Sequence, residues 1–366
     1  MFEALLEIFE IHSLGSLQIS LLAVLPELFL FLAISVLLLV GSSYSTSKRH
    51  GYPMLVKPIA WITIFALGLA FLLVLNNPIP HQIIFSGALI VDNFTNFIKA
   101  VVLLSSIACL AVSLDYIKQE RIHAFEYSVL ILFAVVGMLL LVSSYDLITL
   151  YLAIEMVSLS SYVLATFKRQ SAFSTEAGLK YFILGAFSSG LLLFGSSMVY
   201  GLTGTTNFGQ ISQYLTGTSG NPELISTGLV IGVLFIGMAL LFKATAAPFH
   251  MWAPDVYEGA PTIVSTFFAV VPKIAILGLF IRLFMFSFYD LVGFWQQLLV
   301  FSSLTSMVLA ALIALKQRKL KRFFAYSSVG HVGYLLVGFS TGTLEGIYAM
   351  MIYTIIYIVM TLNAWT

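Results

Sequence analysis

The chain has 366 residues, of which 60% are hydrophobic and only 9% are charged, and its mean hydropathy is +1.02. Soluble domains are about 45–50% apolar and about 25% charged, so this composition excludes an ordinary soluble domain and predicts a protein of the lipid bilayer. The net charge of +1 gives no electrostatic field for nucleic acid. The single cysteine, Cys109, excludes an internal disulfide and fits no metal-binding motif.

Apolar stretches long enough to cross a membrane follow one another along the chain. A hydrocarbon core about 30 Å thick requires about 20 apolar residues per helix. Windows of about 19 residues predict eleven spans, near residues 20–42, 57–75, 90–115, 123–143, 146–167, 175–202, 224–248, 262–287, 296–315, 322–341 and 344–366. The sequence therefore predicts an all-α polytopic membrane protein.

Positively charged residues gather in alternate loops between these spans. The loops after the first, third, fifth and ninth spans contain Lys48, Arg49 and Lys57; Lys118 and Arg121; Lys168 and Arg169; and Lys316, Arg318, Lys319, Lys321 and Arg322. Short loops rich in Lys and Arg stay on the side from which the protein inserts. This parity supports the predicted order of the spans, and we interpret it as placing the N-terminus on the basic side.

Three ionisable residues, Glu155, Lys243 and Lys273, fall inside predicted spans. A charge near a helix centre costs roughly 2.5–3.5 kcal/mol to insert, so such residues are candidates for function. Lys243 has a snorkelling side chain as its alternative, and Glu155 has a hydrogen bond to Ser158 or Ser160. Because a nearby carboxylate changes how firmly a buried lysine holds its proton, a Glu–Lys pair of variable separation can act as a proton switch.

Two prolines lie close to the buried lysines. Pro248 and Pro272 cannot donate a hydrogen bond to the carbonyls four residues earlier, those of Ala244 and Phe268. Interrupted helices with free carbonyls beside a buried charge are typical of ion sites in transporters. The sequence therefore predicts that both carbonyls bind water in a hydrated interior.

The remaining ionisable residues have a structural alternative at least as good as a functional one. Lys180 begins a predicted span and can snorkel, whereas His331 lies among small residues where it can be a hydrogen-bonded packing residue. Lys99, about two turns after Asp92, is most simply a snorkelled or paired residue. Three lesser candidates lie between the seventh and eighth spans, and a solvated turn is favoured for the two carboxylates: His250, Asp255 and Glu258.

The run FKATAAPFHMWAPDVYEGAPTIVSTFFAVVPK, with EAGLKYFILGAFSSGLLLFG before it and KRFFAYSSVGHVGYLLVGFSTGTLEG after it, resembles the subunit 2 family of NADH:ubiquinone oxidoreductase, respiratory complex I. The likeness covers the third to eleventh spans. It implies an antiporter-like helix bundle with a broken seventh helix and an inverted five-helix repeat. It also assigns the family's functional positions to Glu155, Lys243, Lys273 and Lys180, and implies no cofactor or redox centre in this chain.

The resemblance implies three parts: three N-terminal helices in residues 1–115, a first repeat in 116–290 and a partial second repeat in 291–366. Fuller members continue with another lysine-bearing broken helix, so we expect either an incomplete repeat or a separate polypeptide that supplies the missing helices. The implied function is proton translocation in the membrane arm of complex I, beside its other subunits, in the mitochondrial inner membrane. A stand-alone cation/proton antiporter, a chloroplast-type dehydrogenase subunit and a structural scaffold remain alternatives.

Overall fold

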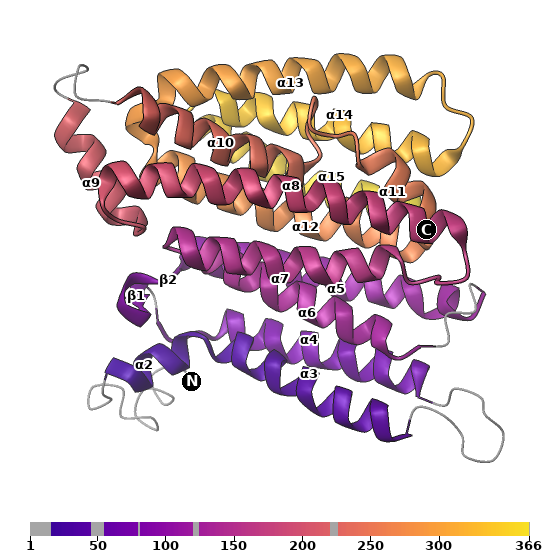
Figure 1. Cartoon of the computed structure of the whole chain (residues 1–366). Coiled ribbons are helices and arrows are strands. Elements are labelled where there is room, and N and C mark those ends of the chain that lie inside the picture. Colours follow the sequence, from indigo (N-terminus) through magenta and orange to yellow (C-terminus); the bar gives the residue numbers. More distant parts are fainter. Residues whose placement is uncertain (1–15, 45–54, 80, 120–123, 220–225, 366) are drawn as a thin grey trace.

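The computed structural model describes residues 16–44, 55–79, 81–119, 124–219 and 226–365. Of the residues in the basic loops, Lys48, Arg49 and Arg121 lie outside these ranges. Within them, ten helices are long and apolar enough to cross a membrane, and the long helices lie side by side in one bundle (Figure 1). The predicted all-α polytopic architecture is confirmed.

The long helices follow the predicted spans. They are α3 (Leu25–Tyr44), α4 (Val56–Leu75), α5 (Asn93–Gln119), α6 (Glu126–Ser143), α7 (Leu147–Ala165), α8 (Ala172–Thr203), α10 (Thr227–Ala244), α12 (Thr262–Arg282), α13 (Val292–Ala314), α14 (Leu320–Ser340) and α15 (Leu344–Trp365). Only α14 is not among the ten apolar spans, because it begins with two cations and carries several polar residues. Periodicity and length therefore identified the bundle helices correctly.

The basic loops meet at one end of the bundle. The end of α3 and the starts of α4, α8 and α14 all lie at the right-hand end in Figure 1, which we call the basic end. The start of α3 lies at the opposite, non-basic end. Residues 1–15 lie outside the described ranges, so the placement of the N-terminus on the basic side stays a prediction. Helix α3 itself crosses the bundle once before the first basic loop.

Short elements at the non-basic end escaped the sequence prediction. Strands β1 (His81–Ile84) and β2 (Leu89–Asp92) form an antiparallel hairpin in which His81 pairs with Asp92. Helix α2 (Ser16–Ala23) packs nearby, and α9 (Phe208–Ser219) forms in a stretch predicted to be a loop. Side chains from α2, the start of α3 and the hairpin form a small apolar cluster, the apolar cap: Ala23, Val24, Ile79, Ile84, Leu89 and Val91.

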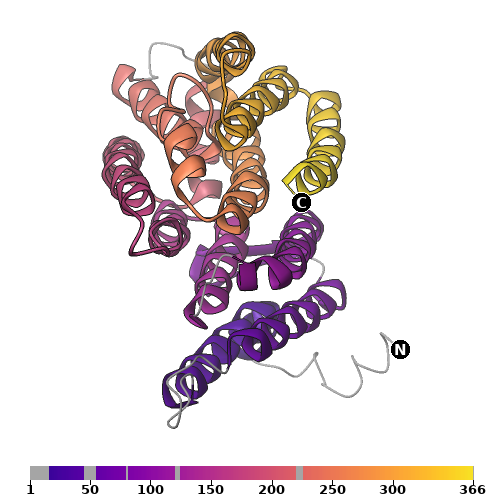
Figure 2. The same ribbon diagram turned by 90° about the vertical axis from the view of Figure 1, so that its right-hand side faces the viewer.

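Helix α12 lies in the middle of the bundle. Every residue from Ile263 to Val271 is buried, and α12 contacts α5 and α6 on one side and α10 and α15 on the other. Viewed from the basic end, the N-terminal helices lie below and the orange and yellow helices of the second half lie above (Figure 2). A polar group on α12 is therefore surrounded by protein and must find its partners there.

Candidate functional site

Lys273 on α12 is almost completely enclosed, with 2% of its surface exposed. Its Nζ donates a hydrogen bond to the hydroxyl of Ser328 on α14 and lies 5.8 Å from the ring centroid of Tyr357 on α15. Within the described ranges, no carboxylate lies within ion-pair distance of this ammonium group. Lys273 is therefore a buried cation whose partners are a hydroxyl and an aromatic face.

A row of hydroxyl and imidazole groups continues from that ammonium group. The hydroxyls of Ser328 and Tyr357 lie 3.0 Å apart, and the Tyr357 hydroxyl donates to the carbonyl of Ala269 at 2.9 Å. One turn along α14, Nδ1 of His331 lies 2.8 Å from the Tyr353 hydroxyl, and its ring centroid is 5.3 Å from that of Tyr357. Ser328 and Tyr357 thus form one hydrogen-bonded group and His331 and Tyr353 form a second group beside it. Each of these side chains can both donate and accept.

Lys243, in the last turn of α10, makes a second cross-helix contact. Its Nζ donates to the hydroxyl of Ser158 on α7 at 2.8 Å, and Glu155 lies one turn earlier on α7. Lys243 thus contacts α7 at Ser158, on the same helix face as Glu155 three residues earlier, and makes no ion pair with that glutamate among the described residues. The alternative of a hydrogen bond from Ser158 or Ser160 to the glutamate is wrong, since both hydroxyls donate to backbone carbonyls four residues earlier.

The helical backbone near the two lysines is interrupted, and a protein side chain satisfies one of the carbonyls that the interruption leaves free. Helix α10 ends at Ala244, and the short α11 (Ala253–Gly259) follows after an irregular segment. The carbonyl of Phe268, which Pro272 leaves free, accepts a hydrogen bond from the Tyr257 hydroxyl at 3.2 Å. This carbonyl therefore has a protein donor where the sequence predicted water. In the irregular segment, His250 is buried and its ring faces Tyr326 of α14.

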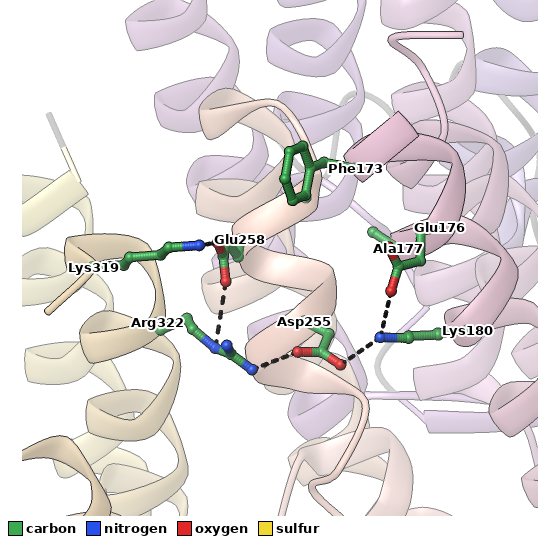
Figure 3. Close-up of a pocket in the computed structure, with 9 residues that line it drawn as sticks. Phe173, Glu176, Ala177, Lys180, Asp255, Glu258, Lys319 and Arg322 are labelled. Carbon is green, nitrogen blue, oxygen red and sulfur yellow. Dashed lines mark hydrogen bonds and ion pairs between the residues drawn. The ribbon is translucent and has the colours of Figure 1, made fainter. Parts of the chain in front are cut away.

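Lys180 belongs to a separate group of charges at the basic end, which Figure 3 shows. Its Nζ lies 2.7 Å from Oε1 of Glu176 and 2.9 Å from Oδ2 of Asp255. The other oxygen of Asp255 lies 2.5 Å from Arg322. The group, which we call the surface charge network, joins α8, α11 and α14 around a cavity of about 230 Å³ and consists of Glu176, Lys180, Asp255, Glu258, Lys319 and Arg322.

The network changes the interpretation of three candidates. Asp255 and Glu258 do not lie in a solvated turn, because both are paired with cations and partly buried on α11. Lys180 has a side chain that is 42% exposed, and none of its described partners is Glu155 or Lys243. The structure thus brings Lys273 and His331 into one cluster, sets Lys243 and Glu155 across α7 and α10, and places Lys180 apart.

Comparison with known proteins decides the family. The family described as "NADH:quinone oxidoreductase/Mrp antiporter, TM" matches residues 144–366. NADH-ubiquinone oxidoreductase chain 2 of Marchantia polymorpha is 52% identical over 348 residues, which cover 94% of this chain and 70% of that protein. This chain therefore belongs to the family of NADH:quinone oxidoreductase and Mrp antiporter membrane subunits. NADH-quinone oxidoreductase subunit N of Azorhizobium caulinodans is 45% identical over 344 residues, covering 94% of this chain and 69% of that protein.

Two solved structures have the same helix bundle. A chain of respiratory complex I from Thermus thermophilus superposes with a TM-score of 0.75 at 28% identity, covering 93% of this chain and 69% of that chain. A chain of the Mrp complex from Dietzia sp. gives a TM-score of 0.77 at 18% identity, covering 94% and 63%, and this likeness concerns the fold. The chain is thus an antiporter-like membrane subunit of the NADH:quinone oxidoreductase type.

Sequence reasoning missed the hydroxyl groups that contact the lysines. Ser158, Ser328, Tyr353 and Tyr357 stand in apolar helices, where serine and tyrosine are common packing residues. Their spacing gives a weak signal: Ser328 and His331 are three residues apart, and the two tyrosines are four apart, so each pair shares a helix face. The sequence does not reveal that these two faces meet at the same lysine.

Proposed function

We propose that this chain moves protons across the membrane as a membrane-arm subunit of respiratory complex I, with Glu155, Lys243 and Lys273 as the ionisable groups of the path. The observation that carries the proposal is the setting of Lys273. Its ammonium group is enclosed, has no carboxylate among the described residues and contacts a row of hydroxyl groups. Intramembrane ionisable residues of this kind mark ion or proton pathways.

The row of hydroxyls allows the proton on Lys273 to move. A cation removed from water without a counterion carries a large desolvation cost, so transfer of its proton to a neighbouring acceptor relieves that cost. Ser328 receives the hydrogen bond from the ammonium group and lies next to Tyr357. His331, on the next turn of α14, is the nearest group in this row that can hold a proton at ordinary pH.

Glu155 and Lys243 provide the adjustable part of the proposed path. Lys243 of α10 contacts Ser158 of α7, one turn from Glu155, so a small shift of α7 against α10 changes the distance from carboxylate to ammonium. A shorter distance favours the charged lysine, and a longer one favours release of its proton. Lys180, in the surface charge network, is proposed to act at the basic entrance and not within this pair.

The relatives support the setting of the proposed function. The Marchantia polymorpha and Azorhizobium caulinodans proteins are named as subunits of NADH oxidoreductases that use ubiquinone or quinone. We propose that other subunits of such a complex carry out electron transfer, and that the complex lies in the mitochondrial inner membrane, as the plant relatives suggest. The three parts of the chain (1–115, 116–290 and 291–366), the reading of α10 and α11 as halves of one broken helix, and a separate polypeptide supplying further helices stay predictions.

Two substitutions test the path. Lys273→Met keeps the apolar stem and removes the charge, so the helix should insert while proton transfer through this point slows by roughly 100-fold, the scale of a lost acid–base group. Glu155→Gln removes the carboxylate opposite Lys243 and should lower pumping less. The measurement is NADH-driven proton uptake into membrane vesicles, normalised to assembled complex.

A matched control is Lys57→Met, which removes an exposed lysine at the basic end of α4 and should leave proton uptake unchanged. Wild-type uptake in the Lys273→Met complex would refute the assignment of the path. Sodium-dependent proton exchange by the chain without NADH-oxidising subunits would instead favour the stand-alone antiporter.

A further inference from the structure

A second buried ion pair lies among the N-terminal helices, outside the proposed path. Glu27 on α3 and Lys99 on α5 are 3% and 1% exposed, and Nζ of the lysine lies 2.6 Å from Oε1 of the glutamate. Of the two expectations for Lys99, a snorkelled or a paired residue, the second is confirmed, with Glu27 as the partner, whereas Asp92 pairs with Arg282 of α12. The two partners come from helices separated by α4, so tertiary packing alone brings them together.

A contribution to the stability of the fold does not explain why this ion pair is buried. Moving two charges out of water costs several kcal/mol per ion, and apolar residues of similar size often serve equally well or better. Moreover, neither carboxylate oxygen of Glu27 accepts a hydrogen bond of good geometry from the described part of the chain. A buried carboxylate that is held only by an ion-pair contact requires another explanation, such as a bound water or a functional role.

The pair lies near the non-basic surface. Glu27 is in the first turn of α3, one turn after Val24 of the apolar cap. Lys99 lies six residues into α5, or about 9 Å along its axis at 1.5 Å per residue. The pair and the apolar cap therefore lie at the same end of α3.

Helix α5 connects the pair to α12. Ile98, the neighbour of Lys99, packs so closely on Gly278 that a Cβ there would lie 3.0 Å from its Cγ2. At the start of α5, Asp92 accepts two hydrogen bonds from Arg282, at 2.7 and 2.8 Å. Gly278 follows Lys273 by little more than one turn, so a displacement of α12 in that region is transmitted to α5.

Other ionisable groups on the surrounding elements do not contact the pair within the described ranges. None makes a salt bridge with either partner. On α5 and the elements packed around it, these groups are Asp92 of β2; Cys109 and Tyr116 of α5; Lys57 of α4; Glu126 and Tyr127 of α6; Lys273 and Arg282 of α12; and Glu345, Tyr348, Tyr353 and Tyr357 of α15. Glu27 and Lys99 are therefore each other's ion-pair partners within the described part of the chain.

We propose that Glu27 and Lys99 form a second proton-exchange site, which releases protons at the non-basic side and is driven by α12 through α5. The inference rests on the proposed function. In the exchange, the proton moves from Nζ of Lys99 to the carboxylate of Glu27, the resulting O–H gives it to water at the non-basic end, and a proton delivered by water from the proposed path restores the ammonium group. Charge and proton count are balanced over the cycle.

The test removes both charges together, which leaves no unpaired ion in the bilayer. In the assembled complex, the double variant Glu27→Gln/Lys99→Met should assemble normally and should lose part of the proton uptake per NADH oxidised, because this site no longer delivers a proton. Lys57→Met is the matched lysine control and should keep the wild-type ratio. A double variant that pumps as the wild type does would overturn the exchange site and leave a purely structural pair.

Two further measurements keep the outcomes separate. Lys273→Met in the same series reports on the proposed function: normal pumping there defeats the path, whereas normal pumping only in the double variant defeats the exchange site. If the double variant does not assemble, Glu27→Asp is used with infrared difference spectroscopy during turnover. A carboxylic-acid carbonyl band that shifts with this substitution supports exchange at Glu27, and identical spectra contradict it.

Discussion

Lys99 and Lys273 are equally buried lysines on two helices that pack against each other, yet their partners differ. Lys99 has a carboxylate at 2.6 Å, whereas Lys273 has a serine hydroxyl and a tyrosine ring. The first arrangement neutralises the charge inside the protein, and the second leaves a net positive charge in the bundle. The comparison shows that burial marks an ionisable residue as unusual, while the partner determines how firmly it keeps its proton.

Removing Glu27, the carboxylate that pairs with Lys99, should have the largest effect on the stability of the complex. Glu27→Gln leaves Lys99 as an unpaired buried ion, and breaking a buried pair in this way costs about 3–5 kcal/mol. We expect a lower thermal midpoint of the complex and less assembled complex on native gels. The double variant Glu27→Gln/Lys99→Met should recover most of this loss. Equal stability of the single variant and the wild type would mean that water reaches the pair.

Giving Lys273 a carboxylate makes it resemble Lys99. Ser328→Asp places an anion beside the ammonium group, and a nearby opposite charge favours the charged form of a lysine by roughly 10-fold or more. Proton uptake should drop by a similar factor, while assembly is retained because the new pair is compensated. The assay is NADH-driven uptake per assembled complex, with Ser328→Asn as the neutral, similarly sized control. Uptake equally low in both variants would point to steric damage.

A smaller change removes only the hydroxyl partner of the unpaired lysine. Ser328→Ala deletes the acceptor of the Lys273 hydrogen bond and one contact of Tyr357. A net hydrogen bond contributes about 1 kcal/mol, so uptake should fall by roughly fivefold. Tyr357→Phe, which keeps the ring over the ammonium group, tests whether the hydroxyl row matters. Unchanged uptake in both variants would exclude this row from the path.

The smallest expected effect concerns the contact between the two helices that carry these lysines. Burial by itself raises the pKa of Asp92, but the Arg282 guanidinium and the Thr95 backbone N–H together hold the pKa of that carboxyl below its ordinary value. A carboxyl with a lowered pKa in the folded state adds stability above its unfolded pKa of about 3.9, and this stability is lost only as the pH falls through the folded value.

Asp92→Asn should therefore lower the stability of the complex by about 1 kcal/mol, the scale of a net hydrogen bond, with a constant difference from the wild type between about pH 5 and pH 8. Thermal midpoints across that range measure it. Asp290→Asn, at an exposed position near the same end, is the control and should have a smaller effect. A difference that grows or shrinks across this range would show that another group titrates with the pair.

Tertiary structure changed several local expectations. The β1–β2 hairpin and helix α9 fall mostly between predicted spans, and only residues 90–92 of β2 lie within one. The sequence predicts no element there because these stretches are short and lack a clear period. Glu155 and Lys243 were predicted as a pair, and in the structure Lys243 donates its hydrogen bond to Ser158 instead of the glutamate. The sequence did not predict a role for Glu27, because it lies near the beginning of an apolar span and its partner, Lys99, is far along the chain.

The sequence by itself determined the membrane class, the course of the long helices, the family likeness and the unusual status of Glu155, Lys243 and Lys273. These properties are local: an apolar run of sufficient length must cross the bilayer, and a charge within it has a cost wherever it lies. Only the tertiary structure decided that Lys99 meets Glu27 while Lys273 meets Ser328 and Tyr357. The choice of partner depends on which helix faces pack together, and that packing is decided by contacts between residues distant in the chain.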